Sequence, residues 1–422
     1  MSMLADQKDR QLGLKHWRHG AIFLVAFAVL VSRRPDAVFH AQFWAEDGQV
    51  WYADAYNLGW WPALFRPLHG YFQLLPRLTV SLALIPHLAR APLVLNLVAV
   101  AVQALPVNLL LSSRSAGWGS LRYRALLAGV YLALPNCTEV SYGITLSQWQ
   151  LALVVFLVLV GSTPKAVGGR LIDILIVLLC SLSGPFCIFL FPIALFVAWS
   201  RRGLSRWVSA GVLAAVSLLQ AWCLLRLDPS GRSHYALGAS AAMLARIVAG
   251  HIYLGTVLGG NGMATTFGQG FLVCIALLGT AILIACLIKS NMEMKLFLLF
   301  SAMVLAASLA SPTNNPPPGV SVWADLATVP AARYWFFPTL AFAWSLLWCF
   351  HGRVTPLKML SAPLLFLMCF GIVREWVHPA LNDMHFTQYA KQFESVAAGT
   401  VVTIPENPEG WEIRLTKRPA GR

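Results

Sequence analysis

Residues 271–288, FLVCIALLGTAILIACLI, contain no charged side chain, and Lys289 follows them directly. A run of this length matches the roughly 20 residues that a helix needs to cross the hydrocarbon core of a membrane. The run is continuously apolar and does not alternate with polar residues, which favours a helix over a strand of a membrane barrel. Because lipid offers the backbone no hydrogen-bond partner, helices and closed barrels are the structures that span it.

Similar apolar blocks recur along the 422-residue chain and are bounded by Arg, Lys, Pro, Gly or Asn. Hydrophobic residues make up 58% of the sequence and charged residues only 11%, whereas a soluble domain carries about 25% charged residues. So few charges cannot coat a water-facing surface of this size. The sequence therefore predicts an all-α polytopic membrane protein with about eleven transmembrane helices.

The formal net charge of +14 is distributed in short basic clusters between the apolar blocks, as at residues 114–124, 201–206 and 289–295. Excess Lys and Arg in short loops mark the cytoplasmic side of a membrane protein, and this pattern argues against nucleic acid as a partner. All cysteines except Cys137 lie in apolar blocks. Their spacing matches neither a disulfide framework nor a metal site.

The orientation follows from the basic segments. Residues 351–358 are basic and expected in the cytoplasm, so the polar tail, residues 374–422, is expected outside, after a transmembrane domain of residues 1–373. The N-terminus is expected in the cytoplasm, and residues 32–71 form the first external loop. Compact size and the lack of eukaryotic-style targeting signals suggest a bacterial inner membrane.

The sequence leaves the threading of residues 72–200 through the membrane open. Residues 72–111 form either two crossings or one crossing and a Pro-broken interfacial piece. Residues 171–199 form either one broken crossing or a hairpin. The charge rule favours a threading with residues 114–124 in the cytoplasm and residues 136–147 outside.

The first external loop holds two adjacent carboxylates, Glu46 and Asp47, among several aromatic residues. One carboxylate can act as general base on an acceptor hydroxyl, while the other orients that hydroxyl or holds a divalent cation such as Mg or Mn. Close like charges also raise the pKa of one member toward the range of a useful base. The alternatives are a solvated pair and an aromatic belt at the membrane interface. His69, in the same loop, is a substrate-binding candidate with a structural alternative.

Arg333 and Tyr334 open an apolar segment from its external end. A guanidinium suits phosphate geometry, and in a water-poor site it would stabilise the charge that grows on a departing lipid phosphate. The alternative is an Arg that reaches out of the membrane beside aromatic residues. Glu139 and Gln148 would line the acceptor or sugar pocket if the loop around them is external, and they belong to a solvated turn otherwise.

The expected external stretch, residues 228–261, supplies Arg232 as a further candidate for a phosphate contact. Residues 241–258 within it are mildly amphipathic and are expected to lie on the membrane surface. The alternative for this stretch is an interfacial helix that only contacts anionic lipids.

A cytoplasmic N-terminus, one helix, an external loop with an acidic pair and then many helices resemble the GT-C class of membrane glycosyltransferases. The resemblance covers the layout of residues 1–350, with Ala45-Glu46-Asp47-Gly48 at the place of the acidic motif. It implies a polyprenyl-phosphate-linked sugar as donor, catalysis on the outer face, Asp47 with Glu46 as the catalytic base, and Arg333 on the phosphate. A spaced Asp-x-Asp is absent, which leaves the metal requirement open.

The leading hypothesis is inverting transfer of a sugar from a polyprenyl phosphate to a hydroxyl of a cell-envelope glycan or lipid. One alternative is a transporter or flippase of a lipid-linked glycan, for which Gly184–Pro185 is a candidate helix break without a visible repeated half. The other is a non-catalytic envelope-assembly protein. Convergence of Glu46, Asp47, Arg333 and Glu139 on one external cavity favours the transferase.

Overall fold

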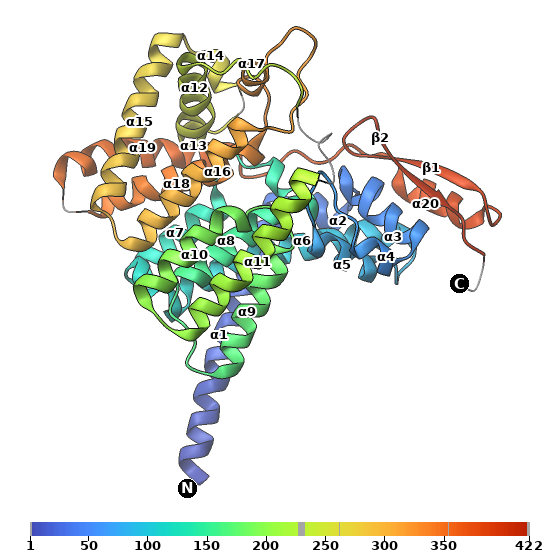
Figure 1. The fold of residues 1–422 in the computed structure, drawn as a ribbon, viewed down its shortest axis with the longest axis horizontal. Coiled ribbons are helices and arrows are strands. Elements are labelled where there is room, and N and C mark those ends of the chain that lie inside the picture. Colours follow the sequence, from blue (N-terminus) through green and yellow to red (C-terminus); the bar gives the residue numbers. More distant parts are fainter. Residues whose placement is uncertain (1, 227–232, 261, 353, 420–422) are drawn as a thin grey trace.

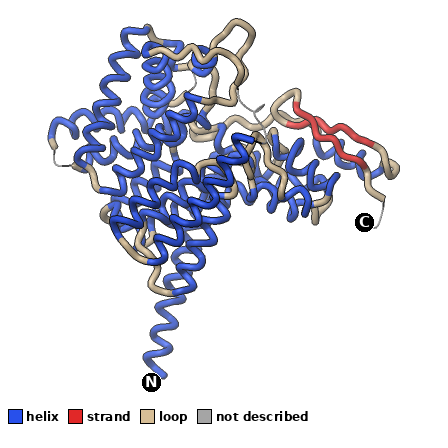
Figure 2. The backbone as a smooth tube through the Cα atoms, in the orientation of Figure 1, coloured by secondary structure: helices blue, strands red, loops and turns tan. Residues whose placement is uncertain are grey.

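The computed structural model describes residues 2–226, 233–260, 262–352 and 354–419 (Figure 1). Helices dominate this part of the chain, and its one sheet is a two-stranded antiparallel hairpin near the C-terminus (Figure 2). The expectation of a predominantly helical protein is confirmed.

Six of the described helices are long and apolar enough to cross a membrane. The six are η2 with α6 (Leu88–Leu111), α11 (Leu204–Arg226), α12 with η7 and α13 (Ala241–Leu258), α15 (Gln269–Lys289), α16 (Met292–Ala310) and α19 (Thr355–Arg374). Residues 271–288 lie in α15, as expected. The larger number of about eleven spans, which rested on apolar run length, is not confirmed by this count.

Several other apolar segments form helices that are too short to cross. They are α5 (Leu74–Ala83), α8 (Gln148–Val160) and α10 (Cys187–Arg201). At about 1.5 Å per residue, helices of this length fall short of a hydrocarbon core of roughly 30 Å. Residues 72–111 thus contain one helix of spanning length and one short helix. Residues 171–199 form two helices, α9 (Val167–Ser181) and α10, separated by a turn at Gly184–Pro185.

Residues 241–258 are the segment that the sequence predicts to lie on the membrane surface. They form a continuous helix that packs against α15 and has the length and composition of a membrane span. Their position relative to the membrane stays a prediction.

The helix α18 (Ala332–His351) lies at the centre of the helical body and packs against α16, α19 and α7 (Leu121–Ala133). Trp335 and Trp344 of α18 are fully buried. The ring of Trp344 lies 4.7 Å from that of Phe297 on α16. Such aromatic contacts bury large apolar areas and fix the angle between the helices.

The helices α15 and α19 instead expose large apolar side chains. Leu277, Ile288, Phe366 and Phe370 are 60–68% exposed. Lipid tails are as apolar as these side chains, so this exposure is expected on a membrane-facing helix.

After α1 (Ser2–Arg33), residues 32–71 are folded and not extended. They form α2 (Asp36–Phe39), η1 (Asp47–Tyr52), α3 (Ala53–Leu58) and α4 (Trp60–Leu64). Figure 1 shows the C-terminal tail beside these elements, away from α15 and α19. The short elements η3 (Ser113–Trp118), η4 (Glu139–Ser141), η5 (Thr145–Ser147), α14 (Met263–Thr266) and α17 (Val322–Leu326) connect the longer helices.

The tail consists of α20 (Phe386–Ser395) and a hairpin of β1 (Val401–Glu406) and β2 (Trp411–Thr416). The strands pair in antiparallel register from Val401 with Thr416 to Glu406 with Trp411. Ile404 and Ile413 are 0% exposed and pack in one apolar cluster with Trp51 of the first loop. Alternate residues of each strand face this cluster, as the two-residue period of a strand requires.

Candidate active site

The turn that carries Glu46 begins at Ala45, whose φ of +49° lies in the left-handed region that residues other than glycine seldom adopt. The C-terminal tail holds this turn. The N–H of Ala45 donates to the carbonyl oxygen of Asn407 at 2.5 Å, and Trp44 pairs with Asn407 as an isolated bridge. Such a conformation costs about 1–3 kcal/mol and persists where its surroundings impose it.

Asp47 is turned into the protein and is only 1% exposed. Its Oδ1 accepts hydrogen bonds from the N–H of Thr145 at 3.0 Å and from Thr145 Oγ1 at 2.6 Å, and its Oδ2 accepts one from the N–H of Ile144 at 2.9 Å. Burial outweighs these hydrogen bonds and raises the pKa of Asp47 to about 7. The side chain joins the first loop to the segment before α8, and it does not line the cavity in which a substrate would bind.

Glu46 has different surroundings from its neighbour. Its side chain is 22% exposed, and its Oε1 lies 3.9 Å from Nε2 of His69. Both side chains line a cavity of about 380 Å³. Glu46 is therefore the member of the carboxylate pair that a substrate can reach.

Arg333 and Glu139 form an ion pair on the wall of the same cavity. Arg333 Nη1 lies 2.6 Å from Glu139 Oε1, and the backbone N–H of Arg333 donates to Oε2 at 3.0 Å. The carbonyl oxygen of Arg333 accepts a hydrogen bond from Trp149 Nε1 at 2.7 Å. The Arg333 side chain is one-third exposed, and its guanidinium has five N–H donors, so donors remain for an anion in the cavity.

Tyr334 contacts the Arg333 side chain and does not line the cavity. It is buried, its hydroxyl lies 3.0 Å from Thr313 Oγ1, and the Arg333 guanidinium lies 5.2 Å from its ring centroid. Tyr334 was expected to bind substrate. In the structure it contacts Arg333, which does line the cavity. Arg232, the other predicted phosphate contact, lies outside the described residues.

The structure brings five of the predicted site residues to one cavity. They are Glu46, His69, Glu139, Gln148 and Arg333. Aromatic rings of Trp44, Tyr71 and Trp149 line it as well. Specific sites commonly combine apolar and aromatic walls with a few convergent polar groups, and this cavity has that composition.

The tail also contributes to the cavity, which the sequence did not predict at the level of residues. Pro408 and Trp411, at the turn between β1 and β2, line it. Behind them, Glu406 is 1% exposed and accepts a hydrogen bond from the N–H of Gln49 at 2.7 Å. Burial, with Asp47 nearby, raises the pKa of Glu406 to about 9. The sequence offers only a weak signal for this contact, the β-prone run at residues 411–415.

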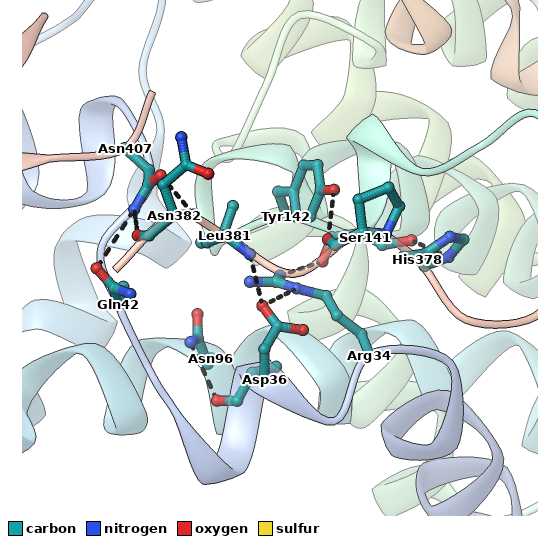
Figure 3. Close-up of polar contacts among 12 residues, drawn as sticks. Arg34, Asp36, Gln42, Asn96, Ser141, Tyr142, His378, Leu381, Asn382 and Asn407 are labelled. Carbon is teal, nitrogen blue, oxygen red and sulfur yellow. Dashed lines mark hydrogen bonds and ion pairs between the residues drawn. The ribbon is translucent and has the colours of Figure 1, made fainter. Parts of the chain in front are cut away.

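A buried polar network anchors the segment between α19 and α20 (Figure 3). Nη1 of Arg34 donates to the carbonyl oxygen of Ser141 at 2.7 Å, and its Nε lies 3.5 Å from Asp36. His378 lies between the hydroxyls of Thr138, at 3.1 Å, and Ser141, at 3.4 Å. Burial and two nearby Arg side chains lower the pKa of His378 to about 3. His378 is therefore neutral at ordinary pH, and it holds the segment after α19 against Thr138 and Ser141.

The divalent cation that the acidic pair suggested stays a prediction for the described residues. Among them, no group of three or more His, Cys, Asp or Glu side chains is placed to hold one. Glu46 with His69 offers two ligands at most, whereas Mg²⁺ is usually held by carboxylates together with substrate phosphates.

The sequence matches no protein-family model. It is also not significantly similar to any curated protein.

Proposed function

We propose that this protein is a membrane glycosyltransferase that moves a sugar from a polyprenyl-phosphate donor to a hydroxyl of a cell-envelope glycan or lipid. The observation that carries the proposal is the placement of Glu46 and Arg333 on one cavity. A base and an anion-binding group are the two parts that such a displacement needs. The resemblance in layout to GT-C enzymes supplies the substrate class.

In the proposed reaction, Glu46 takes the proton of the acceptor hydroxyl as the oxygen attacks the anomeric carbon. The bond between that carbon and the phosphate oxygen breaks, and the phosphate leaves with the electron pair. Arg333 stabilises the charge that develops on the phosphate. One direct displacement inverts the configuration at the anomeric carbon.

Glu46 is preferred over Asp47 as the base because of access. The hydrogen bonds that Asp47 accepts hold it in the interior, whereas no described residue donates a hydrogen bond to Glu46. His69, 3.9 Å from Glu46, is placed to orient the carboxylate.

The proposal also includes the membrane arrangement that the sequence suggested. The cavity faces the external side of a bacterial inner membrane, with a cytoplasmic N-terminus and an external tail, and about eleven segments enter or cross the bilayer. Short helices such as α8 and α10 would then lie inside the helical bundle and not traverse it fully.

The test is a Glu46→Gln substitution in the cells that produce the protein. Gln keeps the size of the side chain and removes the base, and loss of a general base lowers rates by about 10²–10⁴-fold. We expect loss of one sugar from the envelope glycans or lipids, measured by mass spectrometry, at an unchanged protein level. Glu412→Gln is the matched control, because Glu412 pairs with Arg414 on the surface of the tail and does not line the cavity.

An unchanged envelope in the Glu46→Gln strain contradicts the proposal. It would favour the transporter or the assembly protein, since neither needs a base at this position.

A further inference from the structure

The external ends of α18 and α19 lie together. The two helices are consecutive in the chain and pack against each other, so the start of α18, with Arg333, is at the same end as the close of α19, with Arg374. A second cavity, of about 440 Å³, lies at this end. Trp44 and Glu139 line both cavities, so the two spaces are neighbours.

Among the charged side chains that line the second cavity, one has no hydrogen-bond or ion-pair partner among the described residues. Both oxygens of Glu375 accept backbone hydrogen bonds, from the N–H of Asn136 at 2.6 Å and from that of Gly260. Both oxygens of Glu139 are taken by Arg333. The guanidinium of Arg374 lines the cavity and makes no hydrogen bond or ion pair with any described residue. A free guanidinium in this position favours a phosphate or carboxylate ligand.

Gly260 keeps the space beside this guanidinium open. Its φ is +85°, and a Cβ placed there would lie 2.6 Å from Arg374 Nη2. A side chain at this position would occupy the space next to the N–H donors of the Arg374 guanidinium.

An apolar stripe leads along the membrane-facing side of α19 to the same place. Phe366, Phe370 and Val373 are 60–76% exposed, and spacings of four and three residues put them on one face of the helix. Val377, which is 59% exposed, continues the apolar surface and lines the cavity. A ligand that fits both features has an anionic head and a long apolar chain.

We infer that the second cavity holds the phosphate of a prenyl-lipid phosphate through Arg374, while its chain lies along the stripe on α19. The choice of a prenyl chain rests on the proposed function; the anionic head and apolar chain rest on the geometry. The phosphate then lies next to the Arg333–Glu139 pair, and the sugar extends into the first cavity toward Glu46.

The experiment measures binding of farnesyl phosphate to the full-length protein in phosphatidylcholine nanodiscs. Arg374→Gln removes the cation and is expected to weaken binding about tenfold or more, the effect of losing a hydrogen bond to a charged group. Arg226→Gln is the matched control, because Arg226 also ends a long apolar helix, α11, but lines neither cavity. It is expected to bind as the wild type does. Arg374→Lys keeps the charge and is expected to bind better than Arg374→Gln.

Competition identifies the ligand chemistry. Farnesol lacks the phosphate and inorganic phosphate lacks the chain, so each is expected to compete at least tenfold less well than farnesyl phosphate. Equal competition by inorganic phosphate would overturn the lipid assignment.

Equal binding by wild type and Arg374→Gln, or an equal loss in Arg226→Gln, would overturn the site. Glu46→Gln is expected to bind farnesyl phosphate normally, so a failure of the catalytic proposal is distinguishable from a failure of this one.

Discussion

Two neighbouring carboxylates in the first loop have opposite surroundings. Asp47 is buried and accepts hydrogen bonds from Ile144 and Thr145, while Glu46 lines a cavity with His69. A buried, fully bonded carboxylate stabilises a fold, and a carboxylate that faces a cavity can take a proton from a substrate. Substitutions at the two positions should therefore affect different properties.

We expect Asp47→Asn to destabilise the protein by about 1–3 kcal/mol. An amide keeps one acceptor oxygen and turns an NH₂ group toward donors, so a buried N–H loses its partner. Glu46→Gln should change stability by less than about 0.5 kcal/mol, since no described residue donates a hydrogen bond to the Glu46 side chain. Thermal unfolding of both purified variants is the measurement. Equal losses would mean that Glu46 is also a structural residue.

Glu406 should make the attachment of the tail depend on pH. Its pKa is raised from 4.5 to about 9 by burial, so the folded protein binds a proton that the unfolded chain releases. The stabilisation is complete below about pH 4.5 and is lost as the pH rises toward about 9. We expect faster proteolytic release of residues 401–416 at pH 9 than at pH 6.

Glu406→Gln is the control for this pH effect. The amide cannot ionise, so the difference between pH 6 and pH 9 should shrink. A difference that persists unchanged in Glu406→Gln would assign the pH effect to other groups, among them Asp47, whose pKa is also raised, to about 7.

At the scale of elements, the C-terminal hairpin is part of the cavity and not an appendage. Its turn supplies Pro408 and Trp411 to the wall, and Asn407 holds Ala45 beside Glu46. Its inner face rests on the first loop through Ile404 and Ile413. A substitution that weakens the packing of the hairpin should therefore also change the shape of the cavity around Glu46.

Ile413→Ala should loosen the hairpin. The side chain is 0% exposed, and removal of a buried Ile side chain costs about 2–5 kcal/mol. We expect faster proteolysis of the tail and reduced sugar transfer. Val401→Ala, at a position that is 62% exposed on the same hairpin, should leave both unchanged. Normal transfer by an Ile413→Ala protein with a released tail would show that the hairpin is not needed for the site.

The elements that the sequence predicted well are those set by local composition. The apolar run at residues 271–288 became α15. Helix length was harder to predict, because a turn at Gly184–Pro185 divides one apolar run into α9 and α10. The burial of Asp47 could not be foreseen, since it depends on Ile144 and Thr145, which are distant in the sequence.

At the scale of the whole molecule, the packing of distant segments assembles one end of the helical body. The first loop contributes Glu46, the start of α18 contributes Arg333, the end of α19 contributes Arg374, and the tail contributes Trp411. The sequence identified Glu46 because carboxylates are scarce in this chain, with 17 Asp and Glu residues. It identified Arg333 because this residue opens an apolar segment beside aromatic residues. It missed the last two, because a helix-end Arg and a tail Trp look ordinary until the fold places them on a cavity.

The most direct test is sugar transfer by the purified protein in nanodiscs, with radiolabelled lipid-linked sugars extracted from the producing cells as donors. The central claim is that Glu46 and Arg333 act on one substrate in one cavity. It predicts transfer to an envelope acceptor by the wild type, a fall of about 10²–10⁴-fold with Glu46→Gln, and a comparable loss with Arg333→Gln. Transfer at the wild-type rate by Glu46→Gln would contradict it.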